Sequence, residues 1–250
     1  MSRCWLTGAS SGIGAALAVQ LLDQGHQVAL GTRDANRLSH LMQRYPGQVL
    51  AAVGDVDCAE QVSRIIAQIE HTWGALDLVI LNAGTCEYLE SGRFDPALVE
   101  RVVRTNLFGV SHCLAAALSL LRRGERPHLV VMGSAVTWLP LPRAGAYGAS
   151  KAAVRYLVES LRIDLINEGI AVTLVSPGFV DTPLTRRNDF PMPQLWTTER
   201  AAAHITARLP RRPLEINFPT AFTLGLRVIG ALPVRWRLKL CQRLVRAPKD

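Results

Sequence analysis

A tyrosine and a lysine stand four residues apart in the segment Tyr147-Gly148-Ala149-Ser150-Lys151. On a helix this spacing puts both side chains on one face. A lysine ammonium beside a phenol favours the phenolate and lowers a pKa that is about 10 in water, so that the tyrosine can exchange a proton with an alcohol near neutral pH. Such pairs also arise by chance. Here, however, Lys151 is the only lysine before Lys239, and arginine cannot replace a compact ammonium with a tunable pKa.

A run of small residues, Thr7-Gly8-Ala9-Ser10-Ser11-Gly12-Ile13-Gly14, follows the first apolar segment and leads into a helical pattern. Gly8 allows a tight turn, Gly12 lets the backbone approach a pyrophosphate, and Gly14 permits close packing of the helix on the strand. The helix N-terminus then offers free N–H groups and a positive dipole to phosphates. In this setting the run predicts a dinucleotide site, with contacts from Thr7, Gly8, Ser10, Ser11, Gly12, Ile13 and Gly14.

The second apolar run ends in Thr32, Arg33 and Asp34, where the adenosine ribose of a dinucleotide is expected. An acidic residue at the tip would accept hydrogen bonds from the ribose and repel a 2′-phosphate. Thr32 and Arg33 at this place favour NADP(H) over NAD(H). A register that differs by one residue would bring Asp34 to the ribose. The alternative role of Asp34 is to cap the following helix.

Alternating apolar and amphipathic segments must position these residues. Apolar or β-branched runs predict strands at residues 4–7, 27–32, 49–53, 76–81, 128–133, 171–176 and 215–219. Helical patterns lie between the first six of them, at residues 13–24, 37–44, 59–72, 96–106, 110–122 and 149–168. Strands that are apolar on consecutive residues are typical of sheets covered on both faces. The alternation predicts an α/β fold with a doubly wound parallel sheet that binds ligands outside the carboxyl ends of its strands.

Together these residues resemble the short-chain dehydrogenase/reductase family over residues 4–185. Asn82-Ala83-Gly84 follows the fourth strand, Asn106 lies in the next helix, Ser134 ends the fifth strand and Pro177-Gly178 follows the sixth. Asp55 closes the third strand, where the family usually contacts the adenine. The resemblance implies a single-domain Rossmann fold. It also implies an oxidoreductase that moves a hydride between a nicotinamide cofactor and a carbonyl carbon.

The resemblance further implies a role for each site residue. Tyr147 would act as general acid or base, and Ser134 would polarise the substrate oxygen. Lys151 would lower the pKa of the tyrosine and bind the nicotinamide ribose, while Asn106 would position a water that links Lys151 to solvent. Asn82 would mainly brace the sheet. The other implied cofactor contacts are Thr32, Arg33, Asp55, Val56, Ala83, Gly84, Pro177, Gly178, Val180 and Thr182.

Residues 178–213 correspond to the variable substrate lid of that family. Apolar side chains in the lid and just after Ser134 favour an apolar ketone, aldehyde or secondary alcohol, although a lid also needs apolar residues to pack. They are Phe190, Met192, Leu195, Trp196, Trp138 and Leu139. Because cells keep NADP mostly reduced, an NADP enzyme is expected to work as a carbonyl reductase. The helices at 110–122 and 149–168 commonly pair between subunits in the family, which implies a homodimer or homotetramer.

The end of the chain differs from the rest. We expect a catalytic domain over residues 1–219 and a basic, helical extension over residues 220–250. After Pro233, expected as the first helical residue, Val234, Leu238, Cys241 and Leu244 or Val245 recur at helical spacing. Arg235, Lys239, Arg243 and Arg246 lie largely elsewhere on the helix. Two interpretations stay open: the apolar face covers the domain or a partner subunit, or it lies on an anionic membrane surface.

Composition narrows the class of protein. Hydrophobic residues make up 49% of the chain and charged residues 19%, unlike a disordered protein. The five cysteines have no metal or redox spacing and the six histidines form no metal pattern, which favours reduced thiols in the cytoplasm and no metal site. No uninterrupted apolar run reaches about 18 residues, and the first residues lead straight into a strand, so neither a membrane span nor a signal peptide is expected.

The net charge of +8 is concentrated near the end of the chain. Residues 186–250 hold 13 Arg or Lys against 4 Asp or Glu, whereas residues 1–185 hold 15 against 16. Because this basic region lacks interleaved aromatic residues and a known reading motif, we expect no nucleic-acid partner.

Three other functions are alternatives to the reductase. A catalytically silent dinucleotide-binding sensor or scaffold could have lost its tyrosine or lysine, whereas Ser134, Tyr147, Lys151 and Asn106 are all present. A membrane-docking protein with vestigial enzyme parts rests on the terminal segment alone. An epimerase or dehydratase of nucleotide sugars fits the length and the glycine spacing poorly.

Overall fold

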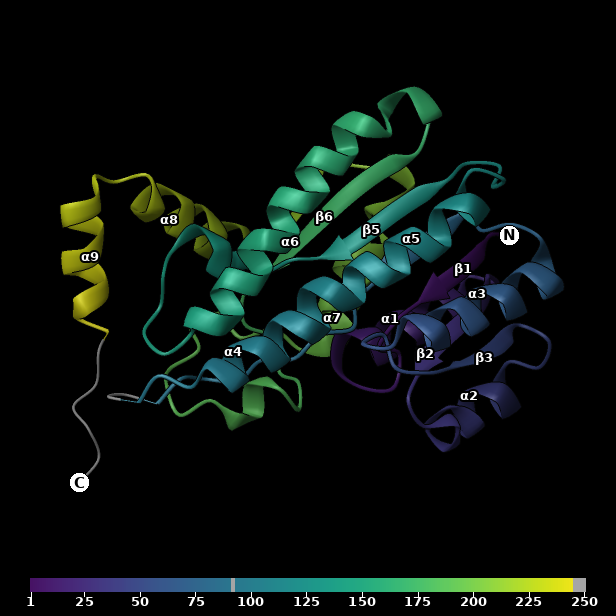
Figure 1. Cartoon of the computed structure of the whole chain (residues 1–250), viewed down its shortest axis with the longest axis horizontal. Coiled ribbons are helices and arrows are strands. Elements are labelled where there is room, and N and C mark those ends of the chain that lie inside the picture. The colour runs from purple at the N-terminus through teal and green to yellow at the C-terminus, as the bar shows by residue number, and fades with distance from the viewer. Residues whose placement is uncertain (91–92, 245–250) are drawn as a thin grey trace.

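The computed structural model describes residues 1–90 and 93–244 (Figure 1). Within them, seven parallel strands form one sheet in the order β3-β2-β1-β4-β5-β6-β7. The strands are β1 (Arg3–Leu6), β2 (Gln27–Thr32), β3 (Val49–Val53), β4 (Leu78–Leu81), β5 (His128–Met132), β6 (Ala171–Pro177) and β7 (Glu215–Phe218). This confirms the predicted doubly wound sheet, in which the strand order reverses between β1 and β4.

Helices cover both faces of the sheet (Figure 1). One face carries α1 (Gly12–Asp23), α2 (Ser39–Arg44) and α7 (Thr198–Thr206). On the other lie α3 (Ala59–Trp73), α4 (Pro96–Val103), α5 (Gly109–Leu121) and α6 (Gly145–Asp164). The helices α8 (Thr220–Gly230) and α9 (Val234–Gln242) follow β7, and α9 lies at the far end of the molecule (Figure 1).

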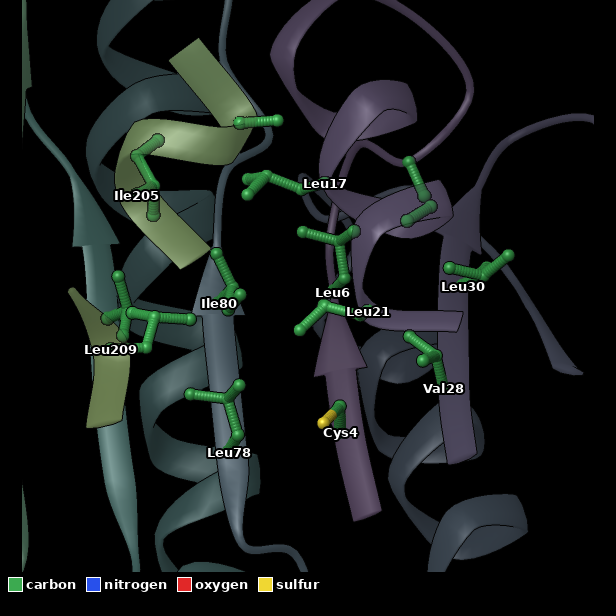
Figure 2. Close-up of a cluster of buried hydrophobic side chains, with 14 of the residues drawn as sticks. Cys4, Leu6, Leu17, Leu21, Val28, Leu30, Leu78, Ile80, Ile205 and Leu209 are labelled. Atoms are coloured by element: carbon green, nitrogen blue, oxygen red, sulfur yellow. The ribbon is translucent and has the colours of Figure 1, made fainter. Parts of the chain in front are cut away.

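Strand residues alternate between two cores because successive side chains point to opposite faces. Leu6 and Ile80 belong to the core under α1 and α7, whereas Trp5 and Val79 belong to the core under α3, α5 and α6. Figure 2 shows the first core, where Leu17, Leu21, Ile205 and Leu209 come together with Cys4, Leu6, Val28, Leu30, Leu78 and Ile80. Burial on both faces explains why these strands are apolar on consecutive residues.

The helix containing the tyrosine and lysine begins earlier than expected. α6 starts at Gly145 rather than at residue 149, so Tyr147 lies in its first turn. The small residues of that turn gave no apolar period from which its start could be predicted. The pattern at 96–106 is likewise split, since α4 ends at Val103 and a π-helical turn, Arg104–Phe108, holds Asn106.

The lid contains a helix that the sequence pattern did not predict. α7 buries only one side, with Ala201, Ala202 and Ile205, and its short alanine-rich stripe is a weak periodic signal. The Thr197 hydroxyl caps it by accepting the N–H of Arg200. Near the end of the chain, Pro233 precedes α9 rather than forming its first residue. Val245 and Arg246 lie outside the described residues.

Candidate active site

A cleft of about 670 Å³ opens beside residues that follow the ends of β1, β2, β4, β5 and β6. It lies at the reversal of the strand order, where doubly wound sheets bind their ligands. Of the predicted catalytic residues, Ser134, Tyr147 and Lys151 line this cleft, whereas Asn106 lies behind its wall. The structure also places around it all the predicted cofactor contacts: Thr7, Gly8, Ser10, Ser11, Gly12, Ile13, Gly14, Thr32, Arg33, Asp55, Val56, Asn82, Ala83, Gly84, Tyr147, Lys151, Pro177, Gly178, Val180 and Thr182.

The glycine turn leaves room for a pyrophosphate. Gly8 and Gly12 have φ values of +67° and +57°, which side chains rarely adopt. A Cβ on Gly14 would lie 2.0 Å from the carbonyl oxygen of Gly8, so only glycine fits where α1 crosses the turn. Ser11 precedes α1 without capping it through its side chain. The first N–H groups of α1 are therefore available to an anion, and the turn fits a dinucleotide.

Thr7 and Asn82 hold this turn in place. The Thr7 hydroxyl oxygen accepts the backbone N–H groups of Asn82 and Ala83, both at 3.0 Å. The Asn82 amide donates to the carbonyl oxygens of Thr7 and Gly8, both at 3.1 Å. The glycine turn after β1 is thereby fixed to the end of β4.

At the far end of the cleft, the charge after β2 is positive. Arg33 lines the cleft, is 81% exposed in its side chain, and lies 3.8 Å from a carboxylate oxygen of Asp55. Asp34 is not part of the lining. Its carboxylate accepts the N–H of Asn36 as the cap of a 3₁₀ turn and lies 3.8 Å from Arg37. The register therefore brings the arginine, and not the aspartate, to the cleft.

Tyr147 and Ser134 form one wall of the cleft. Burial raises the pKa of Tyr147 to about 12, and a hydrogen bond with Ser134 acts in the opposite direction. The sequence had indicated a pKa lowered by Lys151, but in this structure the opposing contribution comes from Ser134. Tyr147 therefore holds its proton at neutral pH. Ser134 also caps the 3₁₀ turn Ala135–Trp138 by accepting the N–H of Val136.

Lys151 is almost fully buried beside the end of β5. Its ammonium donates to the carbonyl oxygen of Met132 at 2.8 Å, which directs its charge to the strand end. Burial lowers the pKa of Lys151 to about 8, so the group still carries its proton at neutral pH. A Cβ on Gly84 would lie 3.5 Å from the Lys151 nitrogen, which places the lysine at the Asn-Ala-Gly segment.

Asn106 fastens three elements behind the cleft. Its amide oxygen accepts the N–H of Thr85 at 2.8 Å. Its amide nitrogen donates to the Thr85 carbonyl oxygen and to the Ser150 hydroxyl, both at 2.9 Å. The side chain thus joins the π-helical turn to the loop after β4 and to α6, one residue before Lys151. Ser150 was not predicted as a partner, since nothing in its spacing distinguishes it from other helical serines.

Cys86 and Tyr88 lie near Tyr147, although neither residue was predicted as part of the site. The Cys86 thiol is hydrogen-bonded to the Tyr88 hydroxyl and lies close enough to Tyr147 and Lys151 to affect their pKa values. Burial raises the pKa of both Cys86 and Tyr88. The only sequence feature that could have indicated them is their position just after Asn82-Ala83-Gly84, which follows a central strand.

The cleft also has a basic rim that the sequence patterns did not predict. Arg101, Arg104 and Arg187 belong to its lining. Arg101 pairs with Glu87 at 2.9 Å and Arg104 pairs with Glu100 at 2.6 Å. The spacing of the first two arginines on one helix face, just before Asn106, could have indicated this rim.

The predicted apolar substrate residues have different positions. None of the six lines the cleft. Trp196 stacks on Phe218 at 5.0 Å and packs against the core, so the alternative interpretation of a packing residue applies to it. Phe190 instead joins an aromatic cluster, in which its ring meets Tyr88 at 5.7 Å and Phe179 at 6.0 Å. Phe222 of α8 extends the cluster, 5.6 Å from Phe179.

An ion pair beside the aromatic cluster joins the loop before α6 to the lid. Arg143, from the loop before α6, pairs with Asp189 of the lid at 2.9 Å and lies over the ring of Tyr88.

Within residues 1–90 and 93–244, no group of three or more His, Cys, Asp or Glu side chains could hold a metal ion. In the same residues, no helix is long and apolar enough to cross a membrane.

Comparison with known proteins identifies the family. A family model described as short chain dehydrogenase matches residues 3–191. An uncharacterized oxidoreductase of Myxococcus xanthus is 34% identical over 231 residues, which are 91% of either chain. An 11-beta-hydroxysteroid dehydrogenase A of Arachis hypogaea is 35% identical over 186 residues, covering 72% of this chain and 53% of that protein. An alcohol dehydrogenase of Thermococcus sibiricus, solved with 5-hydroxy-NADP, matches with a TM-score of 0.78 and 28% identity, covering 87% of this chain and 96% of that one.

Proposed function

Because the chain belongs to the short-chain dehydrogenase/reductase family, whose members are oxidoreductases acting on CH–OH or C=O groups with NAD(P), we propose that it is an NADPH-dependent reductase of an apolar ketone or aldehyde. The observation that carries this proposal is the meeting of Ser134, Tyr147 and Lys151 in the cleft that also holds the glycine turn. The reaction would take place in the cytoplasm, where NADP is kept mostly reduced.

The protonation states support the direction of reduction. Reduction of a carbonyl needs a general acid, and Tyr147 keeps its proton well above neutral pH because it is buried. We propose that its hydroxyl donates this proton to the carbonyl oxygen, which Ser134 polarises. Bound NADPH would supply the hydride. Lys151 would bind the ribose beside the nicotinamide and stabilise the phenolate left on Tyr147.

The choice of NADPH rests on Arg33. Its guanidinium is free to turn toward a 2′-phosphate, since its contact with Asp55 is long and solvent-exposed. Asp34, which would repel a 2′-phosphate, is held in its own turn by Asn36. The NADP derivative in the Thermococcus sibiricus structure supports the same choice.

The aromatic cluster supports an apolar substrate. Tyr88 lies beside Tyr147, and its ring leads through Phe190 and Phe179 to Phe222. Aromatic side chains this close to Tyr147 would favour an apolar ligand. The Arachis hypogaea relative is named for a hydroxysteroid, which is an apolar alcohol of moderate size.

Family members generally act on small molecules and form oligomers, and we propose a homodimer for this chain. An apolar groove runs between α5 and α6, and Tyr156, which lines it, is 78% exposed. Pairing of these helices from two copies would cover the groove, and a second such contact would give a homotetramer.

The experiment that tests the function is a titration of the purified protein with NADPH and with NADH. It is followed by NADPH oxidation with a panel of apolar and polar carbonyl compounds. We expect tighter binding of NADPH and turnover on apolar carbonyls. Tight binding without turnover on any carbonyl would contradict the reductase and favour the silent sensor. Turnover confined to charged sugars would contradict the apolar substrate.

A further inference from the structure

The last two helices expose eight large apolar side chains. Trp236 is 68% exposed, and Val228 and Leu224 are 59% and 58% exposed. Such a density of apolar side chains in solvent marks a surface that contacts something apolar. We call this set the terminal patch; it consists of Leu224, Val228, Leu232, Val234, Trp236, Leu238, Leu240 and Leu244.

The structure of α9 divides its surface into three arcs. The first arc consists of Val234, Leu238 and Cys241, of which only Cys241 is buried. A second apolar arc consists of Trp236, Leu240 and Leu244, spaced four residues apart and exposed. The sequence pattern had identified the first arc together with Leu244, but not Trp236 or Leu240. The third arc, on the side of α9 opposite the two apolar arcs, is basic. It carries Arg235, Lys239 and Arg243, which are also four residues apart.

α8 fastens this arrangement to the body of the protein. A Cβ on Gly230 would lie 2.1 Å from the carbonyl oxygen of Trp138, so the end of α8 packs directly on the turn after Ser134. The Arg237 guanidinium donates to the Gly230 carbonyl oxygen at 3.1 Å and joins α9 to α8. Figure 1 shows α9 beyond α8, at the end of the molecule and away from the sheet. α8 thus packs on the domain, whereas α9 remains largely uncovered.

Charge identifies the kind of partner. Residues 220–250 contain seven Arg or Lys and one acidic residue, Asp250. Among the described residues, Arg235, Lys239 and Arg243 form no ion pair. A second copy docked through the same surface would bring two basic arcs together, which like-charge repulsion opposes. A nucleic acid would satisfy the basic arc but would leave the apolar arc of Trp236 in water.

We propose that the terminal patch and the basic arc of α9 dock on the surface of an anionic phospholipid membrane. The apolar arcs would enter the boundary between headgroups and acyl chains, while Arg235, Lys239 and Arg243 bind the phosphates of the headgroups. Phe222 of the aromatic cluster belongs to the same helix, α8, as Leu224 and Val228, so docking would hold that cluster close to the lipid surface. This last step rests on the proposed apolar substrate; the docking itself does not.

The test is flotation of the full-length protein with vesicles. Vesicles of phosphatidylcholine alone are compared with vesicles that also contain phosphatidylglycerol, at low and at high salt. We expect binding to the anionic vesicles, weakened by salt, and little binding to the neutral ones. Because each basic residue near an anionic surface contributes about fivefold in binding, Arg235→Gln with Lys239→Gln should weaken binding about 25-fold. Trp236→Ser with Leu240→Ser should weaken it about tenfold or more.

A matched control removes two positive charges from a surface outside the terminal patch and α9. Arg64 on α3 and Arg126 before β5 are exposed and outside the terminal patch, so Arg64→Gln with Arg126→Gln should leave vesicle binding unchanged. Retained NADPH binding and circular dichroism show that each variant is folded. The proposal is overturned if the wild type does not bind anionic vesicles, or if the control pair weakens binding as much as Arg235→Gln with Lys239→Gln. It is also overturned if Trp236→Ser with Leu240→Ser binds the vesicles as tightly as the wild type. Since the readout is binding to lipid, such a failure would leave the reductase untouched.

Discussion

Replacing Arg33 by serine tests how the protein chooses its cofactor. Arg33 lines the cleft after β2, whereas the neighbouring carboxylate of Asp34 is held in a local turn. The variant should bind NADPH less tightly and NADH as before, because only NADPH carries a 2′-phosphate. Equilibrium titration by calorimetry, at one fixed salt concentration, measures both dissociation constants.

The size of the effect follows from the exposure of the guanidinium. A hydrogen bond to a charged group contributes about 1.5–3 kcal/mol, and an exposed ion pair contributes less than about 1 kcal/mol. The side chain of Arg33 is 81% exposed and releases only a 3.8 Å contact with Asp55. We therefore expect the lower end, about 1.5 kcal/mol, which is about a tenfold increase in the Kd for NADPH.

Arg37 provides the control for the loss of one positive charge. It is 61% exposed, lies 3.8 Å from Asp34, and is not part of the cleft. Arg37→Ser should therefore change neither dissociation constant by more than about twofold. Equal weakening of NADPH and NADH by Arg33→Ser, or the same weakening by Arg37→Ser, would refute the proposed contact with the 2′-phosphate.

Three further predictions concern the turn, the fold and the assembly. Gly14→Ala places a Cβ 2.0 Å from the Gly8 carbonyl oxygen and should abolish binding of both cofactors in the same titration, whereas Gly225→Ala, where a Cβ meets open space, should not. Burial lowers the pKa of His128 from 6.5 to about 4. Between these pH values the unfolded chain takes up a proton that the folded chain does not, so the free energy of unfolding should fall by about 3 kcal/mol as the pH drops through this window. Urea denaturation should show a loss that is smaller by about this amount in His128→Gln than in the wild type. Tyr156→Arg in the groove of α5 and α6 should shift the mass measured by light scattering from dimer to monomer, while Ile166→Arg, exposed outside the groove, should leave it unchanged; a wild-type monomer would contradict the proposed dimer.

The sequence was sufficient for the fold because its signals are local. Consecutive apolar residues, such as those of β4 and β5, are typical of strands covered on both faces, and the glycine turn is typical of a connection between a strand and a helix. Residues that end parallel strands must meet at one edge of the sheet. The positions of Thr7, Asn82 and Ser134 around one cleft therefore followed from their order in the chain.

What the sequence could not supply depends on contacts between distant segments. The pKa of Tyr147 is set by burial, which a spacing of four residues does not reveal. Trp196 occurs in the lid but packs on Phe218, and only the path of the lid decides between substrate and core. Cys86 was counted among scattered thiols, although the loop after β4 carries it to Lys151.

The terminal segment shows the same limit. Its helical spacing was visible, but the sequence left open whether its apolar stripe is covered, and Val234 of that stripe is 57% exposed. A periodic pattern identifies an amphipathic helix without saying what lies against each face. The exposed arc of Trp236 became apparent only from the path of α9 away from the sheet.

The most direct test of the proposed reaction compares the wild type with Tyr147→Phe in a single turnover, using a carbonyl compound that the wild type reduces and a saturating concentration of NADPH. The variant should bind NADPH within about threefold of the wild type, because only the phenolic hydroxyl is lost. It should oxidise NADPH more slowly by a factor of about 100 or more, because general acid catalysis contributes about 10²–10⁴-fold. Oxidation at the wild-type rate by Tyr147→Phe would contradict the account of this site.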